Sequence, residues 1–532
     1  MKKRVEAQKF GPGFVLDLDD PGYPLPEGII VEKDVPIEMR DGLKLAANAY
    51  RPDKSGKFPV IMSFTIYGKD LSGWGKGYRI PSHRISEATA FEAVDPGFWV
   101  PYDYVVILVD SRGFGRSPGG AWGGYDYYDA IEWAGTQEWS NGNVGLYGVS
   151  YLAIIQWDAA YLRPPHLKAI IPWEADSGQP TRKYGGIPET GFLKKLGELF
   201  LAPSYPAWDR SFLEKRPSAE RVLEPPLERV LEDITVPALI CATWSDQELH
   251  TRGTLWAYKT ISSEHKWLYT HGQHKWAEFY SVEALDIQKK FFDCFLKGAD
   301  SRIMYTPRVR LEVRERLDKY PVRYEDDWPI PRTKYKKLYL DAETGTLNSH
   351  EVSRERKVSY DSADGRTVFD ITFDQDTELT GHMKLKLWVS PEEADDMDLF
   401  ITLRKLDADG NEVYFNSWHA PSRYPVALGW LRLSWRKLDE EKSTPWQPIL
   451  KFEAEQKVEP GEIVPCQIEI YPSSTLFRAG ETLRVVISGK YEVEKSTRFV
   501  FDEHSVNKGK HSIYTGGKYD SYLLIPVVPP RI

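Results

Sequence analysis

Cysteine is scarce in this chain. There are three in 532 residues, Cys241, Cys294 and Cys466, and they lie far apart. A disulfide scaffold needs an even set of cysteines, and a zinc site needs Cys and His ligands at short, regular spacings. We therefore expect neither, and we predict no bound metal.

Long hydrophobic runs are also missing. The longest, such as Tyr104–Val109 and Tyr522–Val528, have the length of a β-strand, whereas a membrane-spanning helix needs about 18 apolar residues or more. The N-terminal MKKRVEAQKFGPGFV is basic but has no apolar stretch of signal-peptide length. These absences predict a cytoplasmic protein with no membrane partner.

The chain has no excess of basic side chains. Its 69 Lys and Arg are outnumbered by 78 Asp and Glu, which gives a formal net charge of -9. Nucleic-acid binding requires a basic face, so we expect no nucleic-acid partner. Aromatic residues are abundant, with 18 Trp and 30 Tyr. They are explained by core packing or by a pocket lined with rings.

The first 300 residues alternate between strand-like and helix-like segments. A chain of this length is expected to form two or three domains. The turn Asp41-Gly42 predicts an opening hairpin, and the amphipathic stretch Val282–Phe295 predicts a closing helix. Strands separated by helices imply a mostly parallel sheet with helices on both faces. The expected strands are Phe58–Thr65, Tyr104–Asp110, Val144–Tyr147, Leu167–Pro172, Val236–Thr243 and Lys266–Thr270.

Two further regions differ from this pattern. Residues 174–233 contain no convincing strand, and helical patterns around Phe192–Phe200 and Ala219–Leu223 predict an inserted helical cap. The alternative, a surface excursion without structure, is improbable at that length. After Gly298 short alternating segments dominate, which predicts a jelly roll or β-sandwich. The expected domains are a catalytic α/β domain (1–173 and 234–300), the cap (174–233) and an all-β domain (301–532).

Ser150 is the candidate nucleophile. It follows the strand Val144–Tyr147, precedes an apolar helical stretch and lies in Gly148-Val149-Ser150-Tyr151-Leu152-Ala153. This is the context of the nucleophile elbow of α/β-hydrolases, whose usual pattern is G-x-S-x-G. Leu152 stands where the second glycine is expected, so the pattern is incomplete.

The other members of a catalytic triad should follow later strands, in the order Ser, acid, His. Asp246 lies just beyond Val236–Thr243 and is the candidate acid, with Glu248 as a weaker competitor. His271 and His274 both follow Lys266–Thr270, and spacing alone does not choose between them. His250 and His265 precede that strand, on the wrong side for this order.

Two oxyanion donors are expected. One is the backbone N–H of Tyr151, which directly follows the nucleophile, and the other comes from the loop after Phe58–Thr65, where Tyr67 carries a hydroxyl.

These motifs together carry a resemblance. They are Tyr67-Gly68-Lys69-Asp70, Asp110-Ser111-Arg112-Gly113-Phe114-Gly115-Arg116-Ser117, Gly148-Val149-Ser150-Tyr151, Trp244-Ser245-Asp246, His271-Gly272-Gln273-His274, Phe291–Gly298, Ile470–Ser474 and Phe477–Gly480. The set resembles the X-Pro dipeptidyl-peptidase (S15) superfamily, and within it the cocaine esterase and α-amino acid ester hydrolase-like (CocE/NonD) hydrolases. The resemblance covers nearly the whole chain.

The resemblance implies an α/β-hydrolase core with an inserted helical cap and a C-terminal all-β jelly roll. It implies Ser150 as nucleophile, Asp246 as acid, and Tyr67 with the Tyr151 N–H as oxyanion hole. It also favours His274 over His271 as the base, because the family's histidine closes this segment. The family elbow is better written G-x-S-Y-x-small, with Ala153 in the last place.

The resemblance also bears on the substrate. Family members that act on amino esters bind the substrate's ammonium with a carboxylate cluster, part of which follows the acid as Gln-Glu-Asp. This chain has Gln247-Glu248-Leu249 and keeps one acid. Glu248 and Trp244 are candidate substrate contacts. We therefore predict a serine hydrolase that cleaves small carboxylic esters through an acyl-enzyme and uses no cofactor. The alternative is an amidase, acylase or aminopeptidase with the same triad, and a homo-oligomer is left open.

Overall fold

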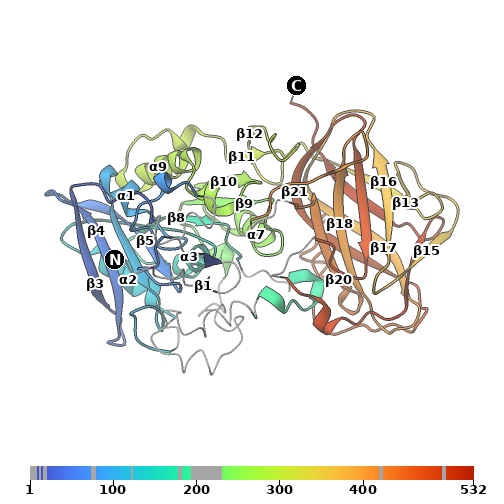
Figure 1. Ribbon diagram of the computed structural model, residues 1–532, viewed down its shortest axis with the longest axis horizontal. Coiled ribbons are helices and arrows are strands. Elements are labelled where there is room, and N and C mark those ends of the chain that lie inside the picture. Colours follow the sequence, from blue (N-terminus) through green and yellow to red (C-terminus); the bar gives the residue numbers. More distant parts are fainter. Residues whose placement is uncertain are drawn as a thin grey trace, which may run out of the picture.

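The computed structural model describes residues 21–73, 80–120, 124–177, 183–192, 194, 230–418, 423–493 and 499–531, with the backbone of 9–10 and 14–15. Two bodies lie side by side: the first carries α-helices around a sheet, and the second is built of strands (Figure 1). Most of the predicted cap, including both of its helical patterns, lies outside the described residues.

The first body is built on a ten-stranded sheet in the order β12-β11-β10-β9-β8-β7-β5-β6-β4-β3. The run from β6 to β11 is parallel, and β4 pairs antiparallel with β6. β3 pairs antiparallel with β4, so the two strands form the opening hairpin that the Asp41-Gly42 turn predicts. The strands are β3 (Ile29–Glu38), β4 (Lys44–Pro52), β5 (Phe58–Thr65), β6 (Val105–Asp110), β7 (Ser140–Val149), β8 (Leu167–Trp173), β9 (Ala238–Thr243), β10 (Lys266–His271), β11 (Val309–Glu312) and β12 (Val322–Glu325).

The central strands are buried on both faces because helices cover the sheet on each side. Every residue of β5, β6 and β9 is buried, which explains their uninterrupted apolar runs. The helices are α1 (Pro96–Trp99), α2 (Asp126–Gly135), α3 (Tyr151–Tyr161), α7 (Thr251–Thr260), α8 (Lys275–Phe279) and α9 (Val282–Lys297). The prediction of a closing helix is confirmed by α9. It begins where the Ser281 hydroxyl accepts the Ala284 N–H, and it ends at Gly298, whose left-handed backbone suits glycine.

Two strands within residues 301–532, the expected all-β domain, pair with the first sheet. β11 pairs in parallel with β10, and β12 completes the first sheet. A short alternating strand has the same local pattern in either domain, so only its pairing partner decides where it belongs.

In the residues that the structure describes, the second body has twelve strands in one mainly antiparallel sheet, in which β24 pairs with both β13 and β17. Its strands match the short alternating segments of the sequence. They are β13 (Lys334–Asp341), β14 (Thr346–Asn348), β15 (Arg356–Asp361), β16 (Arg366–Thr372), β17 (Thr377–Pro391), β18 (Asp398–Leu406), β19 (Glu412–Val413), β20 (Ala427–Arg432), β21 (Val464–Phe477), β22 (Thr482–Ser488), β23 (Lys510–Thr515) and β24 (Tyr522–Val527).

Arg314 joins the two bodies. It follows β11, is 1% exposed, and its guanidinium donates to the Val426 carbonyl at 2.8 Å and to the Ser473 hydroxyl at 2.7 Å. Burial lowers the pKa of this guanidinium to about 9. A buried cation that bonds groups of the second body fixes how the two bodies meet.

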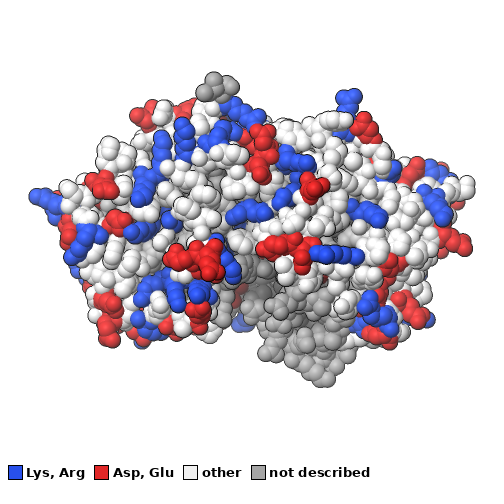
Figure 2. All heavy atoms as spheres, turned by 180° about the vertical axis from the view of Figure 1, so that it is seen from behind, with Lys and Arg blue, Asp and Glu red and all other residues white. Residues whose placement is uncertain are grey.

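The surface carries both signs of charge. Over the face seen from behind, the described Lys and Arg side chains are interspersed with Asp and Glu (Figure 2). Among the described helices, none has the length and apolar character needed to cross a lipid bilayer.

Candidate active site

Ser150 occupies a strained turn between β7 and α3. Its backbone has φ 56° and ψ -116°, a region that non-glycine residues rarely adopt. The turn is held from both sides, because the Ser150 N–H donates to the Trp173 carbonyl at 3.0 Å and the Ser150 carbonyl accepts from Ile154 at 2.8 Å. Such strain persists only where the surroundings impose it, and it is characteristic of a nucleophile elbow.

Gly148 explains how the elbow tolerates Leu152. A Cβ at Gly148 would lie 2.5 Å from the Leu152 Cβ, and Gly148 itself has φ 154°. The Leu152 side chain is completely buried, and its Cβ occupies the space that the Cβ of any residue other than glycine at position 148 would need. The first glycine of the motif is needed, whereas the second can be replaced.

The side-chain hydrogen bond of Ser150 is to His250. Ser150 Oγ lies 3.1 Å from His250 Nε2. His250 immediately precedes α7, and its side chain is 6% exposed. The sequence argument set His250 aside because it counted strands in chain order, whereas the short loop after β9 brings this ring back to the elbow.

His274, the base that the resemblance favours, contacts the β domain. It immediately precedes α8, and its Nδ1 lies 2.8 Å from the carbonyl oxygen of Ser417 in the β domain. The side chain of Ser150 contacts that of His250, and the role of His274 as the base stays a prediction. The resemblance identified a position in the chain, but the β-domain contact decides where this imidazole points.

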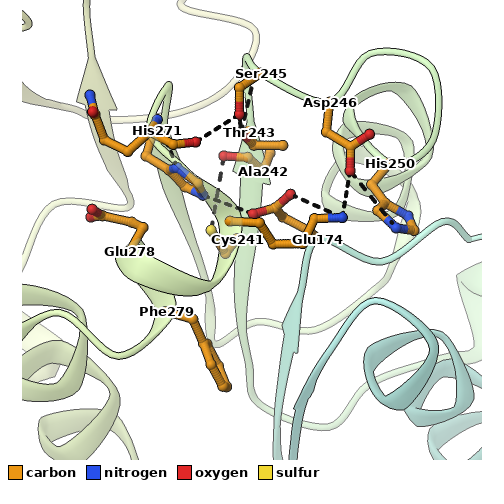
Figure 3. Close-up of polar contacts among 12 residues, drawn as sticks. Glu174, Cys241, Ala242, Thr243, Ser245, Asp246, His250, His271, Glu278 and Phe279 are labelled. Atoms are coloured by element: carbon orange, nitrogen blue, oxygen red, sulfur yellow. Dashed lines mark hydrogen bonds and ion pairs between the residues drawn. The ribbon is translucent and has the colours of Figure 1, made fainter. Parts of the chain in front are cut away.

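Asp246 is completely buried beside this pair. Its Oδ2 lies 2.6 Å from Lys275 Nζ and 3.9 Å from His250 Nε2. Its carbonyl accepts the N–H groups of His250 and Thr251, which closes the loop after β9. The close-up shows the Asp246 carboxylate directed toward His250 (Figure 3).

A second acid lies next to the first. Glu174 directly follows β8, and its Oε1 lies 3.0 Å from Nε2 of His271, the last residue of β10 (Figure 3). Glu174 Oε2 lies 3.7 Å from Lys275 Nζ. Burial opposes charge on His271, but the Glu174 carboxylate raises the pKa of this imidazole. The sequence analysis missed Glu174, although it follows a parallel strand just as Asp246 does.

Lys275 is the cation of this cluster and was also missed. Burial alone would lower its pKa, but the carboxyls of Asp246, Glu174 and Glu92 together raise it, so the side chain is an ammonium at neutral pH. The only sequence feature that pointed to Lys275 was its position directly after His274, the expected base.

Glu92 closes the cluster beneath the elbow. Its carbonyl accepts the Val149 N–H at 3.1 Å, and its carboxyl accepts the Trp276 indole N–H at 3.0 Å. Burial raises the pKa of Glu92 to about 8. Glu92, Ser150 and Glu174 all have positive φ, at 63°, 56° and 51°. This concentration of backbone strain around one serine is typical of a functional site.

The two expected oxyanion donors come from different elements of the first body. Tyr67 follows β5, and its ring packs edge-on against Phe91 at 4.9 Å. Tyr151 is the first residue of α3, where backbone N–H groups have no intrahelical acceptor. The pKa of the Tyr151 phenol is raised well above its usual value, mainly by burial, and Tyr67 is among the neighbouring groups that contribute.

Both predicted substrate contacts, Trp244 and Glu248, are buried. Trp244 is completely buried, and its indole N–H donates to the Glu312 carbonyl at 3.0 Å. Glu248 is 1% exposed, and its two carboxylate oxygens accept hydrogen bonds from the hydroxyls of Tyr424 and Tyr491. Burial raises the pKa of Glu248 to about 7. Both oxygens of this carboxyl are therefore engaged by tyrosines of the β domain, and a role in substrate binding stays a prediction.

The β domain contributes a wall of the site through residues 416–418. Asn416 donates to the Gln273 side chain at 3.0 Å, Ser417 contacts His274, and the Trp418 ring lies 4.8 Å from Lys275 Nζ. Local sequence carries no signal for these contacts. Among the described residues, no group of three or more His, Cys, Asp and Glu side chains is placed to hold a metal ion.

Two protein-family models match segments of this chain. A family model described as X-Pro dipeptidyl-peptidase (S15 family) matches residues 41–197, and one described as X-Pro dipeptidyl-peptidase C-terminal non-catalytic domain matches residues 301–524. The chain is similar to cocaine esterase from Rhodococcus sp., with 24% identity over 94% of this chain and 98% of that protein.

Solved structures agree. An α-amino acid ester hydrolase with 16% identity shares the fold, with a TM-score of 0.68 over 99% of this chain and 100% of that one. A CocE/NonD family hydrolase from Staphylococcus aureus is 44% identical, with a TM-score of 0.86 over 94% of each chain. The resemblance read from the motifs is confirmed: the chain is an enzyme and belongs to the CocE/NonD family of hydrolases.

Proposed function

We propose that the enzyme cleaves small carboxylic esters through an acyl-enzyme on Ser150. The observation that carries the proposal is the strained elbow, which presents the Ser150 hydroxyl within 3.1 Å of an imidazole nitrogen. A serine hydroxyl is a weak nucleophile until a neighbouring base takes its proton. An exposed or randomly placed serine would have neither the strain nor the base.

In the proposed reaction the Ser150 oxygen attacks the ester carbonyl while a histidine accepts the hydroxyl proton. The C–O bond of the ester then breaks, the leaving alcohol takes that proton, and water later releases the acid by the same steps. The Tyr151 N–H and the Tyr67 hydroxyl hold the developing oxyanion. Asp246 stabilises the imidazolium. The order of residues in the chain and the resemblance favour His274 as the base. The imidazole in hydrogen-bond contact with the Ser150 oxygen is that of His250.

The relatives support an ester as substrate. They include cocaine esterase and an α-amino acid ester hydrolase. A substrate without a free α-amino group fits best, because Glu248 is closed in by two tyrosines. The second candidate is amide or peptide hydrolysis with the same residues, and the match to the S15 family model favours it. We also propose that the all-β domain is a jelly roll that walls the site through residues 416–418.

The test compares Ser150→Ala with the wild type on a p-nitrophenyl ester. Turnover should fall by about four orders of magnitude or more, the thermal transition should stay in place, and labelling by a fluorophosphonate should be lost. Turnover by Ser150→Ala close to that of the wild type contradicts the proposal. A benzoyl ester, its matched amide and an ester with a free α-amino group then separate the two candidate activities.

A further inference from the structure

We propose that Asp110 and Lys69 are positioning residues for the oxyanion hole: together they hold the loop that carries Tyr67. This loop, residues 66–70, follows β5. The proposal rests on the proposed function, in which the Tyr67 hydroxyl holds the developing oxyanion. It gives a role to the motif of residues 110–117, which the proposed reaction does not use.

Sheet pairing brings Asp110 to this loop. β5 and β6 are parallel neighbours, and Thr65, the last residue of β5, pairs with Asp110, the last residue of β6. The carboxyl ends of parallel strands meet at one edge of a sheet, so the loops that follow β5 and β6 start beside each other. Thr65 also holds the start of the first loop, because its hydroxyl accepts the Tyr67 N–H at 2.9 Å.

The buried carboxylate of Asp110 binds the backbone of both loops. Its Oδ1 accepts the Lys69 N–H at 2.6 Å, and its Oδ2 accepts the Arg116 N–H at 2.8 Å. Lys69 lies two residues after Tyr67, whereas Arg116 belongs to the loop after β6. A hydrogen bond from an N–H to a carboxylate is roughly twice as strong as one between neutral groups. One side chain therefore fastens the two loops to each other.

Gly115 makes room for this carboxylate. A Cβ at position 115 would lie 2.0 Å from Asp110 Oδ2, and Gly115 has a φ of 55°. Only glycine lets the backbone approach so closely in this conformation. The aspartate and this glycine of the motif are thus explained by the same contact.

Lys69 fastens the loop a second time through its side chain. The side chain is fully buried, and its Nζ lies 2.7 Å from an Asp34 oxygen and 2.6 Å from an Asp70 oxygen. Asp34 belongs to β3, and its other oxygen accepts the Arg116 guanidinium at 2.5 Å. The loop that carries Tyr67 is therefore tied to the opening hairpin as well as to β6.

A fixed loop matters because Tyr67 acts by direction. An oxyanion donor lowers the barrier only when it already points at the place where charge develops, and a displacement of about 1 Å can cost about 10²-fold in rate. Thr65 holds the backbone at Tyr67 itself, and Asp110 holds it two residues later. Asp110 and Lys69 take no part in the bonds that form and break, so they act through Tyr67.

The test combines Asp110→Asn with Tyr67→Phe on the same p-nitrophenyl ester. Asp110→Asn keeps the size of the side chain but replaces one of its two acceptor oxygens with an NH2 group. We expect kcat to fall by about 10–10² with KM nearly unchanged. In a Tyr67→Phe background the same substitution should change kcat by less than about threefold, because the hydroxyl that it would displace is already gone.

Equal falls of kcat in the two backgrounds overturn the proposal, because residues that act independently have additive effects. So does a wild-type kcat for Asp110→Asn or for Tyr67→Phe alone. Ser150→Ala separates this result from the proposed function. Turnover by Ser150→Ala contradicts the proposed function, whereas an inactive Ser150→Ala beside a fully active Asp110→Asn contradicts the positioning role alone.

Asp398→Asn is the matched control. Asp398 is also completely buried, and its carboxylate accepts the Arg432 guanidinium at 2.7 Å, but it lies in the β domain. This variant should lose stability and keep its kcat. A fall of kcat equal to that of Asp110→Asn would overturn the proposal, because the loss of any buried carboxylate would then have the same effect.

If Asp110→Asn does not fold, Lys69→Met takes its place. It removes the ion pairs to Asp34 and Asp70 but keeps the backbone N–H that Asp110 accepts. A fall of kcat that disappears in the Tyr67→Phe background supports the proposal. An unchanged kcat, or an equal fall in both backgrounds, overturns it.

Discussion

Leu152 packs its Cβ against Gly148, and a Cβ at position 148 would come within 2.5 Å of it. The two residues flank Ser150 and hold the turn on which the serine stands. The glycine that the elbow requires is therefore the one before the serine. After the serine, a residue as large as leucine is accommodated because its side chain is completely buried.

Gly148→Ala should damage this turn. The new methyl group meets Leu152, and the alanine backbone must keep a φ of 154°. We therefore expect about 1–3 kcal/mol of strain and a further cost of about the same size from overpacking. Displacement of Ser150 should lower kcat about 10²-fold. The measurements are the thermal transition and ester turnover.

Gly298→Ala is the control for this substitution. Gly298 also has a positive φ, of 69°, but has open space where a Cβ would be. It should lose some stability and keep its turnover. Equal losses of turnover in the two variants would mean that the contact with Leu152 is unimportant.

Tyr67→Phe should lower kcat by about 10²–10³ with little change in KM, because an oxyanion donor acts mainly in the transition state. Tyr127→Phe is the comparison. It removes a hydroxyl that lies 3.4 Å from the Tyr151 hydroxyl but has no predicted role in the reaction. If both variants have the same kcat, Tyr67 is not an oxyanion donor.

Glu248→Ala should destabilise the junction between the two bodies. It leaves the Tyr424 and Tyr491 hydroxyls buried without their acceptor, at a cost of about 1–3 kcal/mol for each. Glu248→Gln keeps an acceptor and should cost less, as measured by urea denaturation. Neither variant should change the ratio of turnover between esters with and without an α-amino group. A changed ratio would indicate that Glu248 contacts the substrate.

Glu92 should make stability depend on pH. Burial raises its pKa from 4.5 to about 8 in the folded state. Between these values the folded protein binds one more proton than the unfolded chain, so stability falls as pH rises from about 4.5 to about 8.

Glu92→Gln keeps an acceptor for the Trp276 indole and removes this titration. The thermal transition of the wild type should therefore drop more between pH 5 and pH 8 than that of the variant. Identical drops would show that Glu92 does not titrate in this window.

The strands of the first sheet and the closing helix could be read from local patterns. Their burial imposes apolar runs, and Ser281 and Gly298 mark the ends of α9. The turn at Ser150 could also be predicted from the sequence, because a nucleophile elbow needs a glycine, a serine and a following helix in a fixed order. The place of β11 was not, since its partner strand comes from another part of the chain.

The sequence by itself determined the family, the elbow and the edge of the sheet where the chemistry gathers, because each depends on residues close together in the chain. Only the tertiary structure decided which imidazole meets Ser150, that Lys275 and Glu174 surround Asp246, and that Glu248 and Trp244 are buried. Those outcomes depend on loops from separate strands and on a β-domain segment. The distances between such groups follow from packing, which no local pattern records.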